Sequence, residues 1–227
     1  RGEAPENTLG GFQYIHDLGI RAVEFDVRQL KDGELIIMHD DNFLRTTGTD
    51  QALYDLNSHQ LEAYNQAHIW MDWEKQLTPT LRQTLSIIHD FEHIEVEVKE
   101  VATMFDAEKL VLELQKQLHG FEQTAVITSF DLKIHQALKR QYSIFKRGLL
   151  VENDIQYLAI EQALELGCCQ IGWMNQLASD EMIQATQQAH LDISVWTVNE
   201  VERAKHLQSL GIDGLITDFP KMMLEQL

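Results

Sequence analysis

The sequence has few cysteines and few prolines, and each shortage excludes a class of protein. Its two cysteines, Cys168 and Cys169, are adjacent, and neighbours in a strand point to opposite faces, so we expect no disulfide between them. Two thiols without a disulfide framework fit a reducing compartment. Three prolines and the absence of low-complexity stretches leave no linker in the 227 residues. The sequence therefore predicts one domain over residues 1–227.

Basic residues are also scarce, with 18 Lys and Arg against 36 Asp and Glu, a formal net charge of −18. Such a field repels phosphate backbones and anionic lipids, which argues against a nucleic acid partner and against docking on membranes. No apolar run reaches the roughly 18 residues of a spanning helix, so we expect no stable membrane insertion. We expect a cytoplasmic protein, with any export signal upstream of Arg1. The oligomeric state stays open.

What the sequence does contain is a regular alternation of short β-branched runs and amphipathic segments. Strands are expected at 21–27, 94–98, 124–128, 146–151, 168–173, 193–198 and 214–217. Helices are expected at 7–18, 80–90, 106–118, 132–140, 154–166, 180–189 and 200–210, with N-cap signals at Thr80 and Asn199. This alternation predicts a parallel sheet with crossover helices.

Counting the strands favours an α/β fold of the (β/α)8 TIM barrel type, whose first strand is missing from this chain. Seven core strands follow Arg1, and the helix near Asn7 has no strand before it, so we place the eighth strand upstream. A doubly wound open sheet is the rival, but it would carry a Gly-rich phosphate loop that is absent here. Residues 40–78, which follow the apolar run 35–38, lack a clean period and predict a small insertion after the second strand.

Carboxylates alternate with apolar residues in two of these strands, Val23–Val27 and Ile94–Lys99. Residues i and i+2 of a strand share a face, so Glu24 and Asp26 stand side by side. Unpaired carboxylates on the inner face of a barrel would cost several kcal/mol each unless they are neutralised. Together with Glu97, these oxygens at the carboxyl ends of strands suit a hard cation such as Mg²⁺ or Ca²⁺.

Salt bridges explain the same pattern equally well, for example Glu97 with Lys99 or Asp26 with Arg28. His39 ends the run Leu35–Asp40, and an imidazole beside a metal site can donate a proton to a leaving alkoxide. An ordinary loop histidine is the alternative. The residues alone leave both questions open.

In its motifs and their order, the sequence resembles the glycerophosphodiester phosphodiesterase family over almost its whole length. Any single motif is a weak signal, whereas all of them in order is a strong one. The matching segments are Pro5-Glu6-Asn7-Thr8, Glu24-Phe25-Asp26-Val27, Asp32-Gly33, His39-Asp40, Arg45-Thr46-Thr47, Glu97-Val98-Lys99, Ser129-Phe130, Trp196-Thr197-Val198-Asn199 and Gly211 to Pro220.

The resemblance implies a (β/α)8 barrel that hydrolyses glycerophosphodiesters to glycerol 3-phosphate and an alcohol, as a phosphoric diester hydrolase. It implies a divalent cation, Mg²⁺ or Ca²⁺, and two histidines as general acid and base. It also implies a lysine near the phosphate and an aromatic residue that lines the pocket. The positions that match are Glu24, Asp26 and Glu97 for the metal, His39 for one histidine, Lys99 for the phosphate and Trp196 for the pocket.

One motif departs from the family pattern. The second histidine of the family lies in a His-Arg-Gly motif after the first strand, and this chain has Arg1-Gly2 without a histidine before it. We place that motif further upstream, because Arg1 lies closer to Pro5 than the arginine of the family does. If the histidine were truly absent, a non-catalytic phosphodiester-binding protein would be the alternative.

The expected substrates are small soluble diesters, because the insertion carries no membrane-binding stripe. A phospholipase D of the same superfamily, acting on lysolipids or sphingomyelin, is the other alternative, and it would need an exposed apolar rim.

Overall fold

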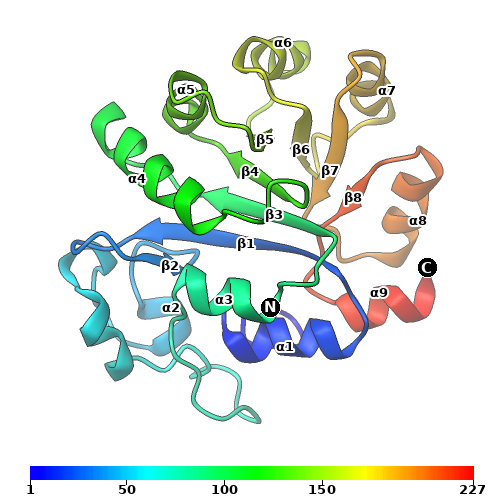
Figure 1. Ribbon diagram of the computed structural model, residues 1–227. Helices are drawn as coiled ribbons and strands as arrows, with labels where there is room; N and C mark the ends of the chain where they lie inside the picture. The colour runs from blue at the N-terminus through cyan, green and yellow to red at the C-terminus, as the bar shows by residue number, and fades with distance from the viewer.

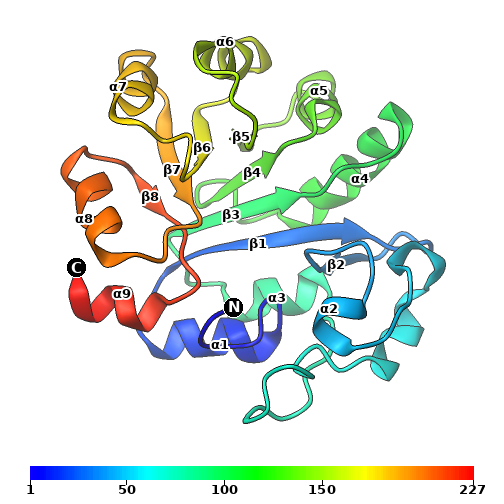
Figure 2. The same cartoon turned by 180° about the vertical axis from the view of Figure 1, so that it is seen from behind.

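Seven parallel strands and one short antiparallel strand form a curled sheet in the computed structural model, which describes residues 1–227 (Figures 1 and 2). The order along the sheet is β2-β1-β3-β4-β5-β6-β7-β8, and only β2 runs antiparallel, against the end of β1. β1 and β8 are the strands on the two sides of the opening and do not pair with each other. The seven core strands predicted from the sequence are confirmed. The strand bounds are β1 (Ala22–Gln29), β2 (Leu35–Ile37), β3 (His93–Val98), β4 (Ala125–Ser129), β5 (Lys146–Val151), β6 (Gln170–Met174), β7 (Asp192–Trp196) and β8 (Gly214–Leu215).

Helices follow the strands and line the outer rim of the sheet, as Figure 1 shows for α4 to α8. The predicted N-cap at Thr80 is confirmed, since its hydroxyl accepts from Gln83 N and the Gln83 side chain returns to Thr80 N. None of the helices combines the length and apolarity that crossing a bilayer requires. The helix bounds are α1 (Leu9–Asp17), α3 (Leu81–Ile87), α4 (Met104–Gln117), α5 (Leu132–Arg140), α6 (Tyr157–Leu166), α7 (Asp180–Gln188), α8 (Val201–Ser209) and α9 (Pro220–Gln226).

Two local predictions were wrong. Asn199 does not cap α8, because the helix starts at Val201 and leaves Asn199 one residue too early. Its amide instead bonds the loop after β8, accepting from Asp218 N at 3.0 Å and donating to the Asp218 carboxylate at 2.8 Å. β6 begins at Gln170, so the two cysteines precede the strand, and both are free thiols.

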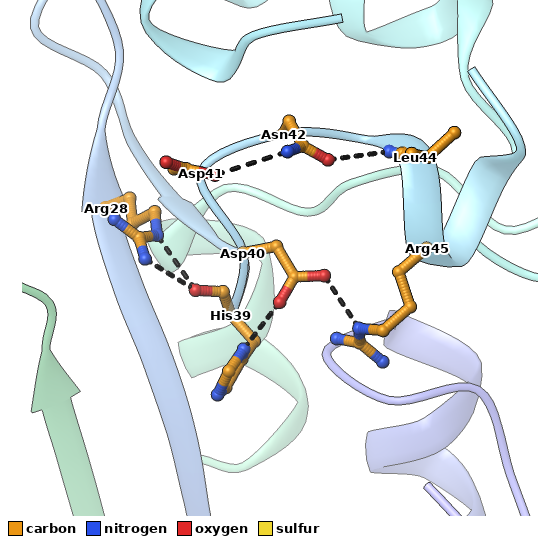
Figure 3. A pocket seen from close by; sticks show the side chains of 7 residues that line it. All are labelled: Arg28, His39, Asp40, Asp41, Asn42, Leu44 and Arg45. Atoms are coloured by element: carbon orange, nitrogen blue, oxygen red, sulfur yellow. Dashed lines mark hydrogen bonds and ion pairs between the residues drawn. The ribbon is translucent and has the colours of Figure 1, made fainter. Parts of the chain in front are cut away.

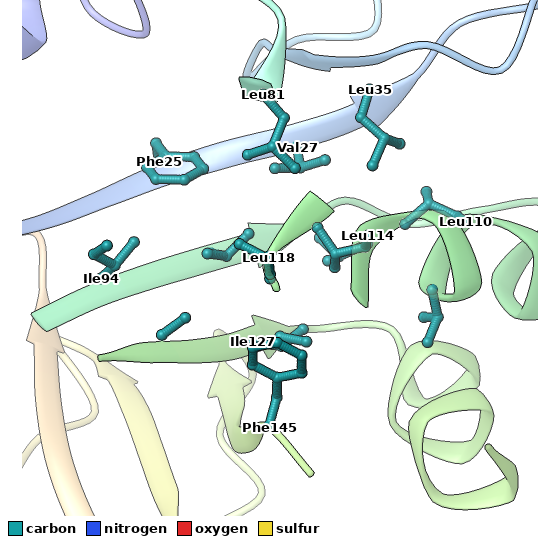
Figure 4. Close-up of a cluster of buried hydrophobic side chains, with 14 of the residues drawn as sticks. Phe25, Val27, Leu35, Leu81, Ile94, Leu110, Leu114, Leu118, Ile127 and Phe145 are labelled. Carbon is teal, nitrogen blue, oxygen red and sulfur yellow. The ribbon is translucent and has the colours of Figure 1, made fainter. Parts of the chain in front are cut away.

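The period-2 pattern of the strands separates the two faces of the sheet. Phe25 and Val27 of β1 and Ile94 of β3 face outward and pack against the outer helices in one buried cluster (Figure 4). Leu110 and Leu114 of α4 belong to the same cluster. The sequence neighbours of Phe25, Val27 and Ile94 face the interior of the curl. The register pairs Glu24 with Glu95 and Asp26 with Glu97, so carboxylates from β1 and β3 meet on the inner face.

Residues 40–78 fold beside the end of β1 and β2, and they share a small apolar cluster with Leu30, Ile36 and Met38 (Figure 2). They contain α2 (Leu44–Thr47) and two 3-10 turns, η1 (Leu53–Asp55) and η2 (Ser58–Ala63). A buried amide secures the segment, because Gln66 accepts from the Thr46 hydroxyl and donates to Thr78 Oγ1 at 2.7 Å. This arrangement holds the start of the segment next to the carboxyl end of β1.

The N-terminal segment, residues 1–8, crosses from the carboxyl end of β8 to that of β1. Gly2 N donates to Asp218 O, and the Glu3 carboxylate accepts from Lys221 N and Met222 N at the start of α9. An ion pair of 3.0 Å joins Arg1 to Asp218. The segment therefore lies across the opening between the first and last parallel strands.

One buried histidine predicts a pH effect on stability. His135 of α5 is fully buried, and its Nε2 lies 3.0 Å from Ser129 O, which can only accept. Burial lowers the pKa of His135, and it also raises the pKa of the neighbouring Cys168 thiol to about 12. Below pH about 6.5 the His135 imidazole binds a proton in the unfolded chain, whereas in the folded protein it stays neutral to lower pH. His135 should therefore lower the free energy of unfolding as the pH falls from 7.5 to 5.5, while the buried Glu24, whose pKa is raised, acts in the opposite direction.

Denaturant titrations at these two pH values would measure the effect. His135→Gln should weaken the pH dependence, whereas the same change at the exposed His89 should leave it unaltered. Equal pH dependence in the wild type and the His135 variant would contradict the assignment.

Candidate active site

Three carboxylates converge on the inner face of β1 and β3, with Glu97 next to the carboxyl end of β3, Asp26 paired with it on β1, and Glu24 two residues earlier on β1. The ligand oxygens of Glu24, Asp26 and Glu97 all lie within 4.8 Å of one another. Asp26 and Glu97 are buried and face each other across the two strands. Glu24 Oε1 is shielded from solvent and has no hydrogen-bond partner. A set of oxygen donors with one buried, unpartnered oxygen fits a hard divalent cation.

Lys99 neutralises part of the negative charge of the cluster. Burial, followed by repulsion from Asp26, raises the pKa of Glu24 well above its ordinary value and also raises the pKa of Glu97. Lys99 Nζ lies 2.6 Å from Asp26 Oδ1 and also bonds Glu97. Burial alone would lower the pKa of Lys99, but attraction to these two carboxylates raises it.

The salt-bridge interpretation therefore accounts for only part of the pattern. It explains Asp26 and Glu97 through Lys99, but Glu24 has no cationic partner. The alternative partner of Asp26, Arg28, is engaged elsewhere and donates to His39 O and to the Tyr54 hydroxyl. Glu24 is thus the one carboxylate of the three without an ion-pair partner, although it is attracted by Lys99.

Asn7 belongs to the cluster, although reasoning about spacing did not single it out. Its Nδ2 donates to Asp26 Oδ2 at 2.7 Å, from a backbone with a positive φ of 54°. Asparagine tolerates this left-handed conformation better than most residues. The only sequence signal was its place in the Pro5–Thr8 motif, which carries no periodic pattern.

A surface pocket of about 470 Å³ opens beside His39 (Figure 3). His39 Nδ1 lies 2.7 Å from Asp40 Oδ1, and the Arg28 guanidinium donates twice to His39 O, at 2.9 and 2.7 Å. Both the ring and the main chain of His39 are therefore held. The residues that line the pocket are Arg28, His39, Asp40, Asp41, Asn42, Leu44 and Arg45.

Trp196 lies at the carboxyl end of β7, on the same side of the sheet as the carboxylates. Its indole Nε1 donates to Gly172 O at 3.0 Å, which fixes the orientation of the ring. The ring meets Phe130, just after β4, edge to face with centroids 5.4 Å apart. The two partly buried aromatics provide apolar surface at this end of the sheet.

The sequence is similar to known proteins over almost its whole length. The model of the Glycerophosphoryl diester phosphodiesterase family matches residues 1–222. A glycerophosphodiester phosphodiesterase of Caldanaerobacter subterraneus is 24% identical over 224 residues, covering 97% of this chain and 91% of the relative.

Solved structures show the same fold. A phosphodiesterase of Oleispira antarctica, in complex with the product sn-glycerol-3-phosphate, superposes with a TM-score of 0.86 at 22% identity, covering 99% of this chain and 92% of that one. A glycerophosphodiester phosphodiesterase of Thermotoga maritima gives a TM-score of 0.80 at 22% identity, with 98% and 92% covered. The predicted (β/α)8 fold is confirmed.

Proposed function

The chain belongs to the glycerophosphoryl diester phosphodiesterase family, and from this premise we propose that it hydrolyses glycerophosphodiesters to glycerol 3-phosphate and an alcohol. The observation that carries the proposal is the convergence of Glu24, Asp26 and Glu97 beside Lys99. The pocket lined by His39 opens on the same side of the sheet. In parallel α/β barrels the chemistry lies at this end of the strands. The product bound to the O. antarctica relative supports a small phosphate ester as ligand.

We assign Glu24, Asp26 and Glu97 to a divalent cation, Mg²⁺ or Ca²⁺, since all three offer carboxylate oxygens and Glu24 lacks a partner. When bound, such a cation neutralises negative charge on a phosphate oxygen. Asn7 keeps Asp26 in place by donating from its amide to Oδ2, while Oδ1 lies 2.6 Å from Lys99 Nζ.

The remaining groups act on the substrate in this proposal. Lys99 supplies positive charge at the phosphate as negative charge develops. His39 exchanges a proton with the entering or leaving oxygen. Trp196 contributes an apolar wall. The leaving alcohol points toward the pocket lined by Asp40, Asp41, Asn42, Leu44 and Arg45.

Removal of the metal tests this proposal directly. With glycerophosphocholine as substrate, release of glycerol 3-phosphate should stop in the presence of a chelator and return when Mg²⁺ or Ca²⁺ is added in excess. Metal binding should also raise the melting temperature, since a ligand that binds only the folded state stabilises it. Turnover that persists after complete chelation would contradict the metal assignment.

A lysolipid substrate is the second candidate, and one observation favours it. Leu44 lines the pocket and is 52% exposed, while Ile69 and Met71 of the same insertion are 52% and 94% exposed. Leu44 is the one apolar side chain in the pocket lining, and an exposed apolar side chain there suits an acyl chain better than a small alcohol. Turnover of monomeric lysophosphatidylcholine should be compared with turnover of glycerophosphocholine in the wild type and in Leu44→Ser. A loss confined to the lysolipid would favour this candidate.

A further inference from the structure

Four charged or titratable side chains, His39, Asp40, Arg45 and Glu6, form a continuous chain of contacts beside the pocket. Three of them lie outside the predicted site, and Figure 3 draws all but Glu6. Asp40 bridges His39 Nδ1 and Arg45 Nε, at 2.7 Å each, with a different oxygen toward each partner. The other two nitrogens of Arg45 donate to both oxygens of Glu6. Paired bonds between a guanidinium and a carboxylate are strong and directional.

The arrangement determines which nitrogen of His39 carries the proton. An ionised carboxylate can only accept hydrogen bonds, so Nδ1 must be the donor and Nε2 is left free for chemistry. Partial burial alone would raise the pKa of Asp40, but hydrogen bonds from Arg45 and His39 outweigh it and hold the pKa below its ordinary value. Asp40 is therefore ionised at neutral pH and keeps this tautomer.

Arg45 also connects two separate parts of the site. Glu6 precedes Asn7, whose amide holds Asp26, and Glu6 lies 39 residues from Arg45 in the sequence. The Glu6 side chain is 11% exposed, and that of Asp40 is 22% exposed, so the bonds are partly shielded from solvent. The guanidinium thus ties the segment that supports the carboxylate cluster to the segment that carries His39.

We propose that Asp40, Arg45 and Glu6 are positioning residues that fix the tautomer and the place of His39 relative to the carboxylate cluster. The proposal deepens the proposed function and rests on it, because it assigns these residues to the same site. A misplacement of about 1 Å at a catalytic group can cost roughly 100-fold in rate. Loss of a link should accordingly lower kcat by about 10- to 100-fold, with a smaller effect on KM.

The tautomer provides a test that needs no turnover. In Asp40→Asn, Arg45 Nε still requires an acceptor, so the new carbonyl oxygen should face Arg45 and the new amide NH₂ should face His39. Nδ1 must then accept, and the proton should move to Nε2. Nitrogen-15 spectra of labelled histidine should show the Nδ1-H form in the wild type and the Nε2-H form in this variant. Identical His39 spectra in the two proteins would overturn the proposal.

Kinetics supply the second test. Arg45→Gln and Glu6→Gln should reduce kcat on glycerophosphocholine, and Arg45→Lys should restore part of it. In a His39→Ala background neither change should reduce activity further, because both act through His39. An equal loss in that background would overturn the proposal.

A matched control is Arg140→Gln, which breaks the surface pair with Glu108 (2.9 Å) far from the pocket and should leave kcat unchanged. Melting temperatures with and without metal would identify a variant that is merely unstable. If the wild type cleaves no diester while the tautomer still shifts in Asp40→Asn, the proposed function fails and the positioning of His39 stands.

Discussion

Replacing Glu97 with glutamine should lower kcat/KM on glycerophosphocholine roughly a thousandfold, or about 4 kcal/mol of transition-state stabilisation. The amide keeps the size of the side chain but removes one of the three carboxylates that lie within 4.8 Å of one another. Steady-state kinetics with a fixed excess of Mg²⁺ or Ca²⁺ would measure the loss. The rise in melting temperature on addition of metal should shrink in the same variant.

The fold should survive this substitution. Glu97 is repelled by Asp26 and attracted by Lys99, so removing its charge relieves one interaction and weakens another. Glu95→Gln is the matched control, because Glu95 lies on the same strand and face, is buried, and accepts from Ser194 Oγ at 3.3 Å, a bond that an amide oxygen can keep. Normal turnover in Glu97→Gln, or an equal loss in Glu95→Gln, would remove the basis for the metal assignment.

Replacing His39 with alanine should lower kcat by about 10² to 10⁴, the usual contribution of a positioned acid or base. The reason is geometric, since Asp40 holds Nδ1 and leaves Nε2 as the only ring nitrogen free for proton transfer. The leaving group distinguishes the two roles. A p-nitrophenyl ester of glycerol phosphate needs no proton on departure, so the defect should nearly vanish on it if His39 is the acid. The defect should persist if His39 is the base.

His206 offers a control of the same design. Its Nε2 lies 2.8 Å from Asp180 on the surface, and its side chain is 45% exposed against 46% for His39. His206→Ala should therefore retain wild-type kcat on both esters. A loss there as large as at His39 would mean that breaking any surface imidazole–carboxylate pair damages the protein, and the specific role of His39 would have to be abandoned.

Much of the fold follows from patterns that the sequence displays within a few residues. Alternation in Val23–Val27 places Glu24 and Asp26 on one face of a strand, because the side-chain period of a strand is two. β5 and α5 lie at the predicted residues, since β5 ends in the apolar run Leu149–Val151 and α5 is amphipathic, with Ile134, Ala137 and Leu138 buried. The motifs indicated the family because each is a short contiguous stretch that can be recognised without the tertiary structure.

What only the tertiary structure decided concerns polar partners that are distant in sequence. The pairing of Asp26 with Glu97 depends on strand register, and the contact of Arg45 with Glu6 depends on the path of two irregular segments. Asn199 shows the same limit, since its N-cap signal was overridden by Asp218 on a neighbouring loop. Local periodicity specifies which face a side chain takes, because it reflects backbone geometry. A long-range hydrogen bond is chosen by whichever donors and acceptors the loops place within reach, and irregular loops have no period to reveal it in advance.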